Sequence, residues 1–317
     1  MRYIHYKESH IVPHVAVHGR GNKRSVLVLS NFPSAGTPLE LKADISLEIV
    51  LKFLQSSIRY RFAEINLVTS SQLDVDGLLS IWTILNPEKS EKFQTVLRAA
   101  VYTSSFHQKT TEEGMRLSTV IESLYPHDST IGSLEQIFYE IEEIIVNQEK
   151  HNDIWKTVKE QIEKDTNLIK GKGYVNEFPH IDLAVFDLPQ DVNLISLFSS
   201  TKYHKILVIL PGQRYYLRYK YETWVELVSY TPPPRIDLTE LAGHLRTKEN
   251  HNKGYWQWNK VTTPRPSLSF VTDNDMLADS HISPQALLAN LIRYLEDSTT
   301  RQDLIWTPND WKPYCAE

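Results

Sequence analysis

The sequence is poor in cysteine and in long apolar runs. Its single cysteine, Cys315, excludes an intrachain disulfide and a cysteine-rich zinc site. Apolar runs such as residues 206–210 are far shorter than the roughly 20 residues that a membrane-spanning helix needs. The first residues also lack the apolar segment of a signal peptide. We therefore expect a cytoplasmic protein without a membrane partner.

Several familiar catalytic motifs are absent as well. The sequence contains no phosphate-binding P-loop, no G-x-G-x-x-G, no G-x-S-x-G and no H-E-x-x-H. These absences argue against binding of ATP or NAD and against serine-hydrolase chemistry. The net charge of -5 argues against a protein that coats nucleic acid.

The remaining composition is that of an ordinary globular protein. Hydrophobic residues make up 41% and charged residues 23% of the 317 residues, which is enough to build one large core or two modest ones. Two glycines and a proline occur within residues 170–179, which favours a boundary between domains there. We therefore expect an α/β fold with an N-terminal sheet-and-helix domain over residues 1–172 and a smaller mixed α/β domain over residues 173–317.

The first third alternates short apolar runs with helical patterns. Residues 14–17 and 25–30 read as two strands, and the polar turn between them predicts a hairpin. A helix is expected over about 44–62, followed by a strand at 64–69 and a second helix at 78–85.

The middle third is predicted to be helical and the last third rich in strands. Ser133 and Gln136 fit a capping box, so we expect a helix over 133–164. Three isoleucines of its apolar stripe should be buried: Ile137, Ile141 and Ile144. Strands are expected at 181–189, 205–211, 213–221 and 254–261, before a last helix that starts at Ser283-Pro284.

The sharpest chemical signal is the turn from Ser70 to Gly77, between an apolar strand and an apolar helix. Functional residues favour the carboxyl ends of strands in α/β sheets. Asp74 and Asp76 are separated by one residue, so both carboxylates could bind one Mn²⁺ or Mg²⁺ ion. The alternative is that one of the two aspartates simply caps the following helix.

Two phosphatase families resemble this turn. Haloacid-dehalogenase-type phosphatases use a D-x-D-G motif whose first aspartate, here Asp74, is the nucleophile. In the DHH phosphoesterases, D-x-D follows a polar turn, and the spacer Ser70-Ser71-Gln72 is similar to that pattern. The Asp-His-His triplet that names the DHH family is absent. This resemblance implies a metal-dependent hydrolase that acts on a small phosphorylated molecule, an ester or an anhydride.

A larger part of the chain resembles a bacterial family of unknown function. Members of that family often carry Asp at the position of His18 and His at the positions of Asn31 and Gln72. The aspartates Asp44, Asp74 and Asp76 match its pattern. The segments that carry the resemblance are VAVHG at 15–19, LVLSNFP at 27–33, TPLELKADISLEI at 37–49 and RYYLRYKYETWVELVS at 214–229.

Together these residues predict one cleft. Asp74 and Asp76 are the expected catalytic residues. The expected metal ligands are Asp74, Asp76, Asp44 and His18, and the expected substrate contacts are Asn31, Gln72, Arg214 and Arg218.

Each of these assignments has a structural alternative. Asp44 could cap the helix that follows it, and His18 could be a histidine of a simple turn. Arg214 and Arg218 could lie on the solvated side of an amphipathic strand.

The leading functional hypothesis is a DHH-like metal-dependent hydrolase. The sequence leaves two alternatives open: a binding protein that keeps the cleft without the metal, or an unrelated biosynthetic enzyme on the same fold. Replacing imidazoles by amides at Asn31 and Gln72 weakens transition-metal binding, which favours the first of these alternatives.

Overall fold

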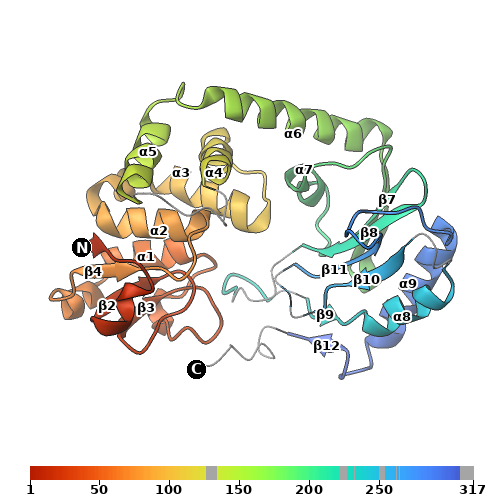
Figure 1. The fold of residues 1–317 in the computed structure, drawn as a ribbon, viewed down its shortest axis with the longest axis horizontal. Coiled ribbons are helices and arrows are strands. Elements are labelled where there is room, and N and C mark those ends of the chain that lie inside the picture. Colours follow the sequence, from red (N-terminus) through yellow and green to blue (C-terminus); the bar gives the residue numbers. More distant parts are fainter. Residues whose placement is uncertain are drawn as a thin grey trace. The chain divides into compact units, whose positions relative to one another are not determined.

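The computed structural model divides the chain into two compact units (Figure 1). Unit 1 holds Met1–Gln161 and Val225–Thr231, and unit 2 holds Ile162–Trp224 and Pro232–Glu317. Both contain helices and a sheet, so the mixed α/β class is confirmed. The domain boundary expected between residues 172 and 173 stays a prediction. The structure describes residues 1–125, 134–220, 227–231, 233–249, 254–261, 263 and 265–307.

Unit 1 is built on a four-stranded sheet in the order β1-β4-β2-β3, with every neighbouring pair parallel. Its apolar strands are covered, as expected for a parallel sheet, and β2 is buried at every position. The strands are β1 (Arg2–Tyr3), β2 (His14–Val17), β3 (Ser25–Leu29) and β4 (Leu67–Thr69).

Helices α1 and α2 pack on this sheet, and α3, α4 and α5 form a further layer behind them (Figure 1). The core between sheet and helices includes Val17, Leu29, Phe53, Val68 and Ile81. The helices are α1 (Ser46–Gln55), α2 (Val75–Leu85), α3 (Pro87–Phe106), α4 (Glu112–Leu124), α5 (Leu134–Val146) and α6 (Asn152–Lys172), which runs on into unit 2. Short 3-10 turns are found at Glu8–Ile11, Leu39–Leu41 and Ser57–Phe62.

The predicted hairpin at residues 14–30 is wrong, because β2 and β3 run parallel. Parallel neighbours usually need a long crossover. Here the strands are so short that the chain can return without a helix. A four-residue strand is about 13 Å long, and an extended connection over residues 18–24 can span roughly 23 Å.

The helix predicted over 133–164 is broken in two. Helix α5 ends at Val146 and α6 begins at Asn152. The buried Arg116 side chain from α4 donates to carbonyl oxygens at the end of α5 and in the connecting turn, which satisfies carbonyl groups that have no helical partner where α5 ends. Burial of the stripe is confirmed for Ile137, Ile141 and Ile144. The cap expected at Ser133 lies outside the described residues.

Unit 2 contains a six-stranded sheet in the order β10-β11-β8-β7-β6-β5, in which only the β6–β7 pair is parallel. Each predicted strand of the last third is present. The chain also forms β5 inside the stretch expected to be a linker. The strands are β5 (Tyr174–Phe178), β6 (Leu183–Asp187), β7 (Lys205–Leu210), β8 (Arg214–Tyr219), β10 (Tyr255–Trp258) and β11 (Ser267–Val271).

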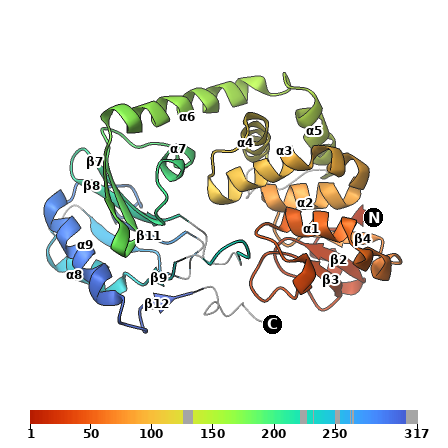
Figure 2. The same ribbon diagram turned by 180° about the vertical axis from the view of Figure 1, so that it is seen from behind.

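Apolar cores cover both faces of this sheet. Helices α8 (Thr239–Thr247) and α9 (Pro284–Ser298) pack on one face, and α7 (Leu194–Ser199) packs on the other. Ser283 caps α9 as predicted, since its side chain accepts from the backbone N–H of Ala286. A small pair, β9 (Arg235–Ile236) with β12 (Ile305–Trp306), completes the unit (Figure 2). Among the described residues, no helix is long and apolar enough to cross a membrane.

Candidate functional site

The candidate site lies where two neighbouring parallel strands of unit 1 end. His18 directly follows β2, and the turn from Ser70 to Asp74 follows β4. The two turns touch, because the Ser70 hydroxyl donates to the His18 carbonyl oxygen at 3.1 Å. Gly19 has a φ of 77°, and a Cβ atom there would lie 2.2 Å from the Ser71 hydroxyl oxygen. A glycine is therefore required to bring the strand ends this close.

His18 is the centre of the site. Its side chain is only 2% exposed, and Nε2 lies 2.9 Å from Oδ2 of Asp74. Nδ1 lies 3.0 Å from the Ser46 hydroxyl oxygen and 3.3 Å from Oδ2 of Asp76. The Phe32 ring packs edge-on against the imidazole, with 5.4 Å between the ring centres. One buried imidazole thus connects two carboxylates.

The hydrogen-bond pattern indicates that both ring nitrogens of His18 carry a proton. Asn31 donates from Nδ2 to the Asp44 carbonyl at 2.8 Å, which orients its Oδ1 toward the Ser46 hydroxyl. Ser46 donates to that Oδ1 and accepts from the Asn31 backbone N–H, so Nδ1 of His18 has to donate to it. Nε2 faces a carboxylate and also has to donate. This arrangement is an imidazolium.

The surrounding charges favour the same protonation state. Burial alone lowers the pKa of His18, but the Asp74 and Asp76 carboxylates together outweigh it and raise that pKa from 6.5 to about 10. His18 therefore carries a positive charge at neutral pH.

Asp76 is a buried acceptor that joins two helices. Its Oδ2 accepts from the backbone N–H of Ser46 at 2.9 Å, and its Oδ1 accepts from the N–H of Leu47 at 2.8 Å. These are the first N–H groups of α1, which have no partner inside that helix. The Ser80 hydroxyl adds a further bond to Oδ1 at 3.1 Å. Asp76 thus caps α1 from the first turn of α2.

Asp74 is the N-cap of α2. The structural alternative, in which one of the two aspartates caps the following helix, therefore applies to Asp74. Its Oδ1 accepts from the backbone N–H of Gly77 at 2.8 Å, and its other oxygen faces His18. Gly77 is needed because a Cβ atom there would lie 2.1 Å from the Gln72 carbonyl oxygen. The Asp74 side chain remains 20% exposed, whereas that of Asp76 is 1% exposed.

The expectation that Asp44 caps α1 is wrong. The N-cap residue is Ile45, which makes no side-chain capping bond. Oδ1 of Asp44 accepts instead from the backbone N–H groups of Val228 and Ser229, at 2.7 and 2.9 Å. The Ser229 hydroxyl donates to Oδ2. Asp44 therefore holds the chain at Val228 and Ser229 on unit 1.

The remaining predicted contacts are Gln72 in unit 1 and Arg214 and Arg218 in unit 2. Gln72 is exposed beside the turn, and only its backbone bonds back to Ser70. Arg214 and Arg218 lie on β8 in unit 2, where Arg218 stacks over the Tyr216 ring at 5.0 Å. Tyr216 is buried, so the arginine face of β8 is not simply a solvated side. Substrate contacts from Gln72, Arg214 and Arg218 stay predictions.

The sequence does not point to Ser46 and Ser80 as hydrogen-bond partners in this site, or to Glu48 as a neighbouring charge. The serines are ordinary helix residues until the fold places them beside Asp76. Burial raises the pKa of Glu48, with Arg98 opposing and Asp44 adding to this rise. Glu48 pairs with Arg98 at 3.5 Å.

The described residues do not fit a metal site as they stand. Within the part of the chain that the structure describes, no group of three or more histidine, cysteine, aspartate or glutamate side chains is arranged to hold a metal ion. Both oxygens of Asp76 accept from protein donors, and both nitrogens of His18 face acceptors. A metal ligand must instead present free lone pairs. The assignment of Mn²⁺ or Mg²⁺ to His18, Asp44, Asp74 and Asp76 stays a prediction.

A family model described as a family of unknown function (DUF6687) matches residues 1–304, so the chain belongs to that family. No curated protein and no solved structure matches the chain. Membership of a family of unknown function is therefore confirmed, whereas the resemblance to DHH phosphoesterases stays a prediction.

Proposed function

We propose that this member of a family of unknown function is a binding protein without hydrolase activity. In this proposal a protonated His18 balances part of the negative charge of Asp74 and Asp76, in the place that a divalent cation takes in metal-dependent phosphoesterases. The observation that carries the proposal is the geometry around His18: Nδ1 lies 3.0 Å from the Ser46 hydroxyl oxygen and Nε2 lies 2.9 Å from the Asp74 carboxylate, so we infer that both ring nitrogens donate. A histidine in this state has no lone pair for a metal ion.

The charge of the site determines what it can bind in this state. Two carboxylates, Asp74 and Asp76, stand against the one imidazolium of His18, which leaves one negative charge. A phosphate group would be repelled unless a divalent cation neutralised this charge first. The metal-free site therefore does not suit the phosphorylated molecule expected from the resemblance.

The metal-dependent phosphoesterase is the second candidate function. One observation favours it: His18, Asp74 and Asp76 meet at the carboxyl ends of the adjacent strands β2 and β4. Metal binding would have to release one proton from His18 and detach Asp76 from the first turn of α1. Affinity for the metal would therefore rise with pH and fall off steeply near neutrality.

The two candidates predict different responses to metal. We would measure the melting temperature and metal binding by calorimetry at pH 7, with and without millimolar Mn²⁺ or Mg²⁺, for wild type and Asp74→Asn. An ion present at a hundredfold its Kd stabilises a protein by about 2.7 kcal/mol, which a melt detects readily. We expect no shift in either protein.

The contrary result is equally clear. A Mn²⁺-dependent rise in wild type that Asp74→Asn abolishes would overturn the proposal. Hydrolysis of p-nitrophenyl phosphate with the same metal requirement would then establish the phosphoesterase.

A further inference from the structure

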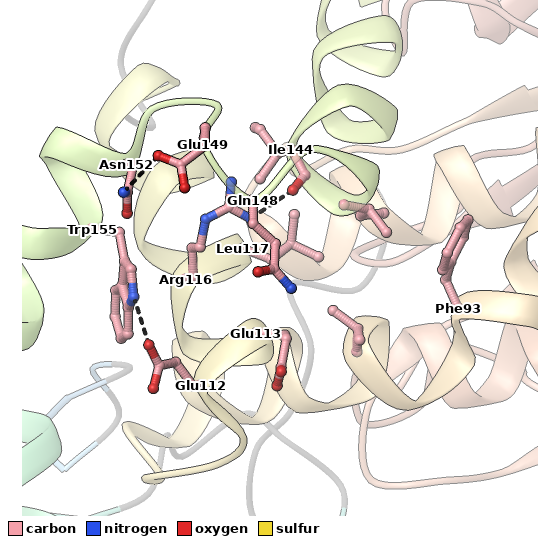
Figure 3. Close-up of a pocket in the computed structure, with 12 residues that line it drawn as sticks. Phe93, Glu112, Glu113, Arg116, Leu117, Ile144, Gln148, Glu149, Asn152 and Trp155 are labelled. Carbon is pink, nitrogen blue, oxygen red and sulfur yellow. Dashed lines mark hydrogen bonds between the residues drawn. The ribbon is translucent and has the colours of Figure 1, made fainter.

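A cavity of about 430 Å³ lies among the helices of unit 1, away from the strand ends (Figure 3). This volume is within the range of sites that bind small molecules. The cavity is lined by α3, α4, α5, α6 and the turn between α5 and α6. Its apolar and aromatic side chains are Phe93, Val96, Leu117, Ile144, Ile145 and Trp155.

A buried arginine lines this cavity. Arg116 is 7% exposed and donates from Nη1 to the Ile144 carbonyl at 2.6 Å. Nη2 donates to the carbonyls of Asn147 and Lys150 at 2.8 and 2.7 Å. Nε is buried and has no hydrogen-bond partner among the described residues. Buried donors of this kind are usually satisfied, so an unpaired Nε indicates a missing acceptor.

The charge of Arg116 is also incompletely neutralised. Its partners are carbonyl oxygens, and no carboxylate among the described residues forms a salt bridge with it. Burial lowers the pKa of Arg116, and Glu149 opposes that effect only from a distance. A carboxylate from a ligand would provide the acceptor and the negative charge together.

The rim of the cavity carries the opposite charge. Glu112, Glu113 and Glu149 are exposed lining residues. Lys159 already pairs with Glu112 at 2.6 Å, so Glu113 and Glu149 carry the remaining charge. Figure 3 shows Trp155 and Phe93 at opposite ends of the lining, with Arg116 between them. The cavity therefore combines a buried cation, aromatic walls and an acidic rim.

We propose that this cavity binds a free amino acid with an apolar or aromatic side chain. The ligand carboxylate would accept from Nε of Arg116, its ammonium group would face the acidic rim, and its side chain would pack against Trp155. A simple carboxylic acid would be repelled at the rim, and a simple amine would leave Nε unpaired. The proposal rests on the binding function proposed above and names a class of ligand for it. The cavity uses none of the residues of the His18 site.

The experiment uses the full chain and three matched probes by calorimetry at pH 7. The probes are L-phenylalanine, phenylalaninamide, which lacks the carboxylate, and N-acetylphenylalanine, which lacks the ammonium group. A charged hydrogen bond contributes about 1.5–3 kcal/mol, so each analogue should bind at least about tenfold more weakly than phenylalanine. No binding of phenylalanine at about 10 mM, which is tenfold above a Kd of about 1 mM, or equal binding of the three probes, overturns the proposal.

Variants locate the site. Arg116→Lys should weaken phenylalanine binding at least about tenfold, because lysine cannot keep the fork of donors. If that variant does not fold, Glu113→Gln and Glu149→Gln test the rim without touching the buried bonds. Glu160→Gln removes an exposed carboxylate of α6 outside the lining and is the control. Loss of affinity in the control as large as in the rim variants would place the ligand elsewhere and refute the assignment.

Discussion

The site around His18 and the cavity around Arg116 both bury a cation in unit 1, but the two cations have different partners. His18 is 2% exposed and lies between two carboxylates, with each nitrogen donating to a protein acceptor. Arg116 is 7% exposed, faces only carbonyl oxygens, and has an Nε atom without a partner among the described residues. We call a site closed when all its buried polar groups have protein partners, and such a site stabilises the fold. A site with an unpaired buried donor is open, because a ligand can supply the missing acceptor.

This difference separates the effects of mutation. Changes in the closed site should alter the free energy of unfolding and its pH dependence. Changes on the rim of the cavity should alter ligand binding and leave stability nearly unchanged. Three predictions test the site around His18.

The largest effect is expected for Asp76→Ala. The substitution leaves the His18 cation without one of its two carboxylates and removes the acceptor of two N–H groups of α1. Removal of one partner of a buried ion pair costs about 3–5 kcal/mol. Urea denaturation at pH 7 should show this loss in the free energy of unfolding.

Two controls sharpen this result. Ile141 is fully buried in α5, and Ile141→Ala should cost about 2–5 kcal/mol without changing the pH dependence of stability. Glu160→Gln on the exposed face of α6 should stay within about 0.5 kcal/mol of wild type. If Asp76→Ala behaves like Glu160→Gln, the His18 site is not a stabilising centre.

The second effect is a loss of stability at alkaline pH. The folded state raises the pKa of His18 from 6.5 to about 10, because the charge of Asp74 and Asp76 outweighs burial. A raised pKa means that the stabilisation is complete below pH 6.5 and disappears as the pH rises toward 10. The loss should exceed about 1.4 kcal/mol, which corresponds to one unit of pKa shift.

The control for this titration is His18→Asn. His18 has a φ of 50°, a conformation that asparagine tolerates better than most residues. This variant has no imidazole to titrate, so its stability should change less than that of wild type between pH 6.5 and 10. Parallel curves for the two proteins would show that His18 does not carry the charge.

Much of the fold could be predicted from local patterns. Buried positions could be predicted from the spacing of apolar residues in β6, β7 and α5. This is possible because the period of the side chains along a strand or helix follows from its backbone geometry. The direction of β3 could not be predicted. A short polar connection fits a hairpin equally well, and the choice depends on how β2 pairs with β4 on its other side.

The site was predictable only in part. Asp74 follows a strand and precedes a helix, which is sufficient to expect a cap. The partners of Asp76 could not be expected, because Ser46 lies 30 residues earlier in the chain and its role depends on tertiary contact. Arg116 gave no signal, since a single arginine in a helical pattern is normally exposed.

The smallest effect is expected for Asp74→Asn, and it distinguishes a cap from a counter-ion. Asparagine can still accept the Gly77 N–H, so the cap of α2 should survive, and at a pH well above the folded pKa of His18, where the imidazole is neutral in both proteins, the stability should change by less than about 1 kcal/mol. The negative charge nearest to Nε2 of His18 is lost, so the pKa of His18 should fall and the alkaline loss of stability should begin at lower pH. Asp74→Ala removes the cap as well and should cost about 1 kcal/mol more throughout. NMR titration of the His18 ring in wild type and Asp74→Asn measures the pKa directly. An unchanged value would mean that Asp74 serves α2 alone and that Asp76 is the counter-ion of His18.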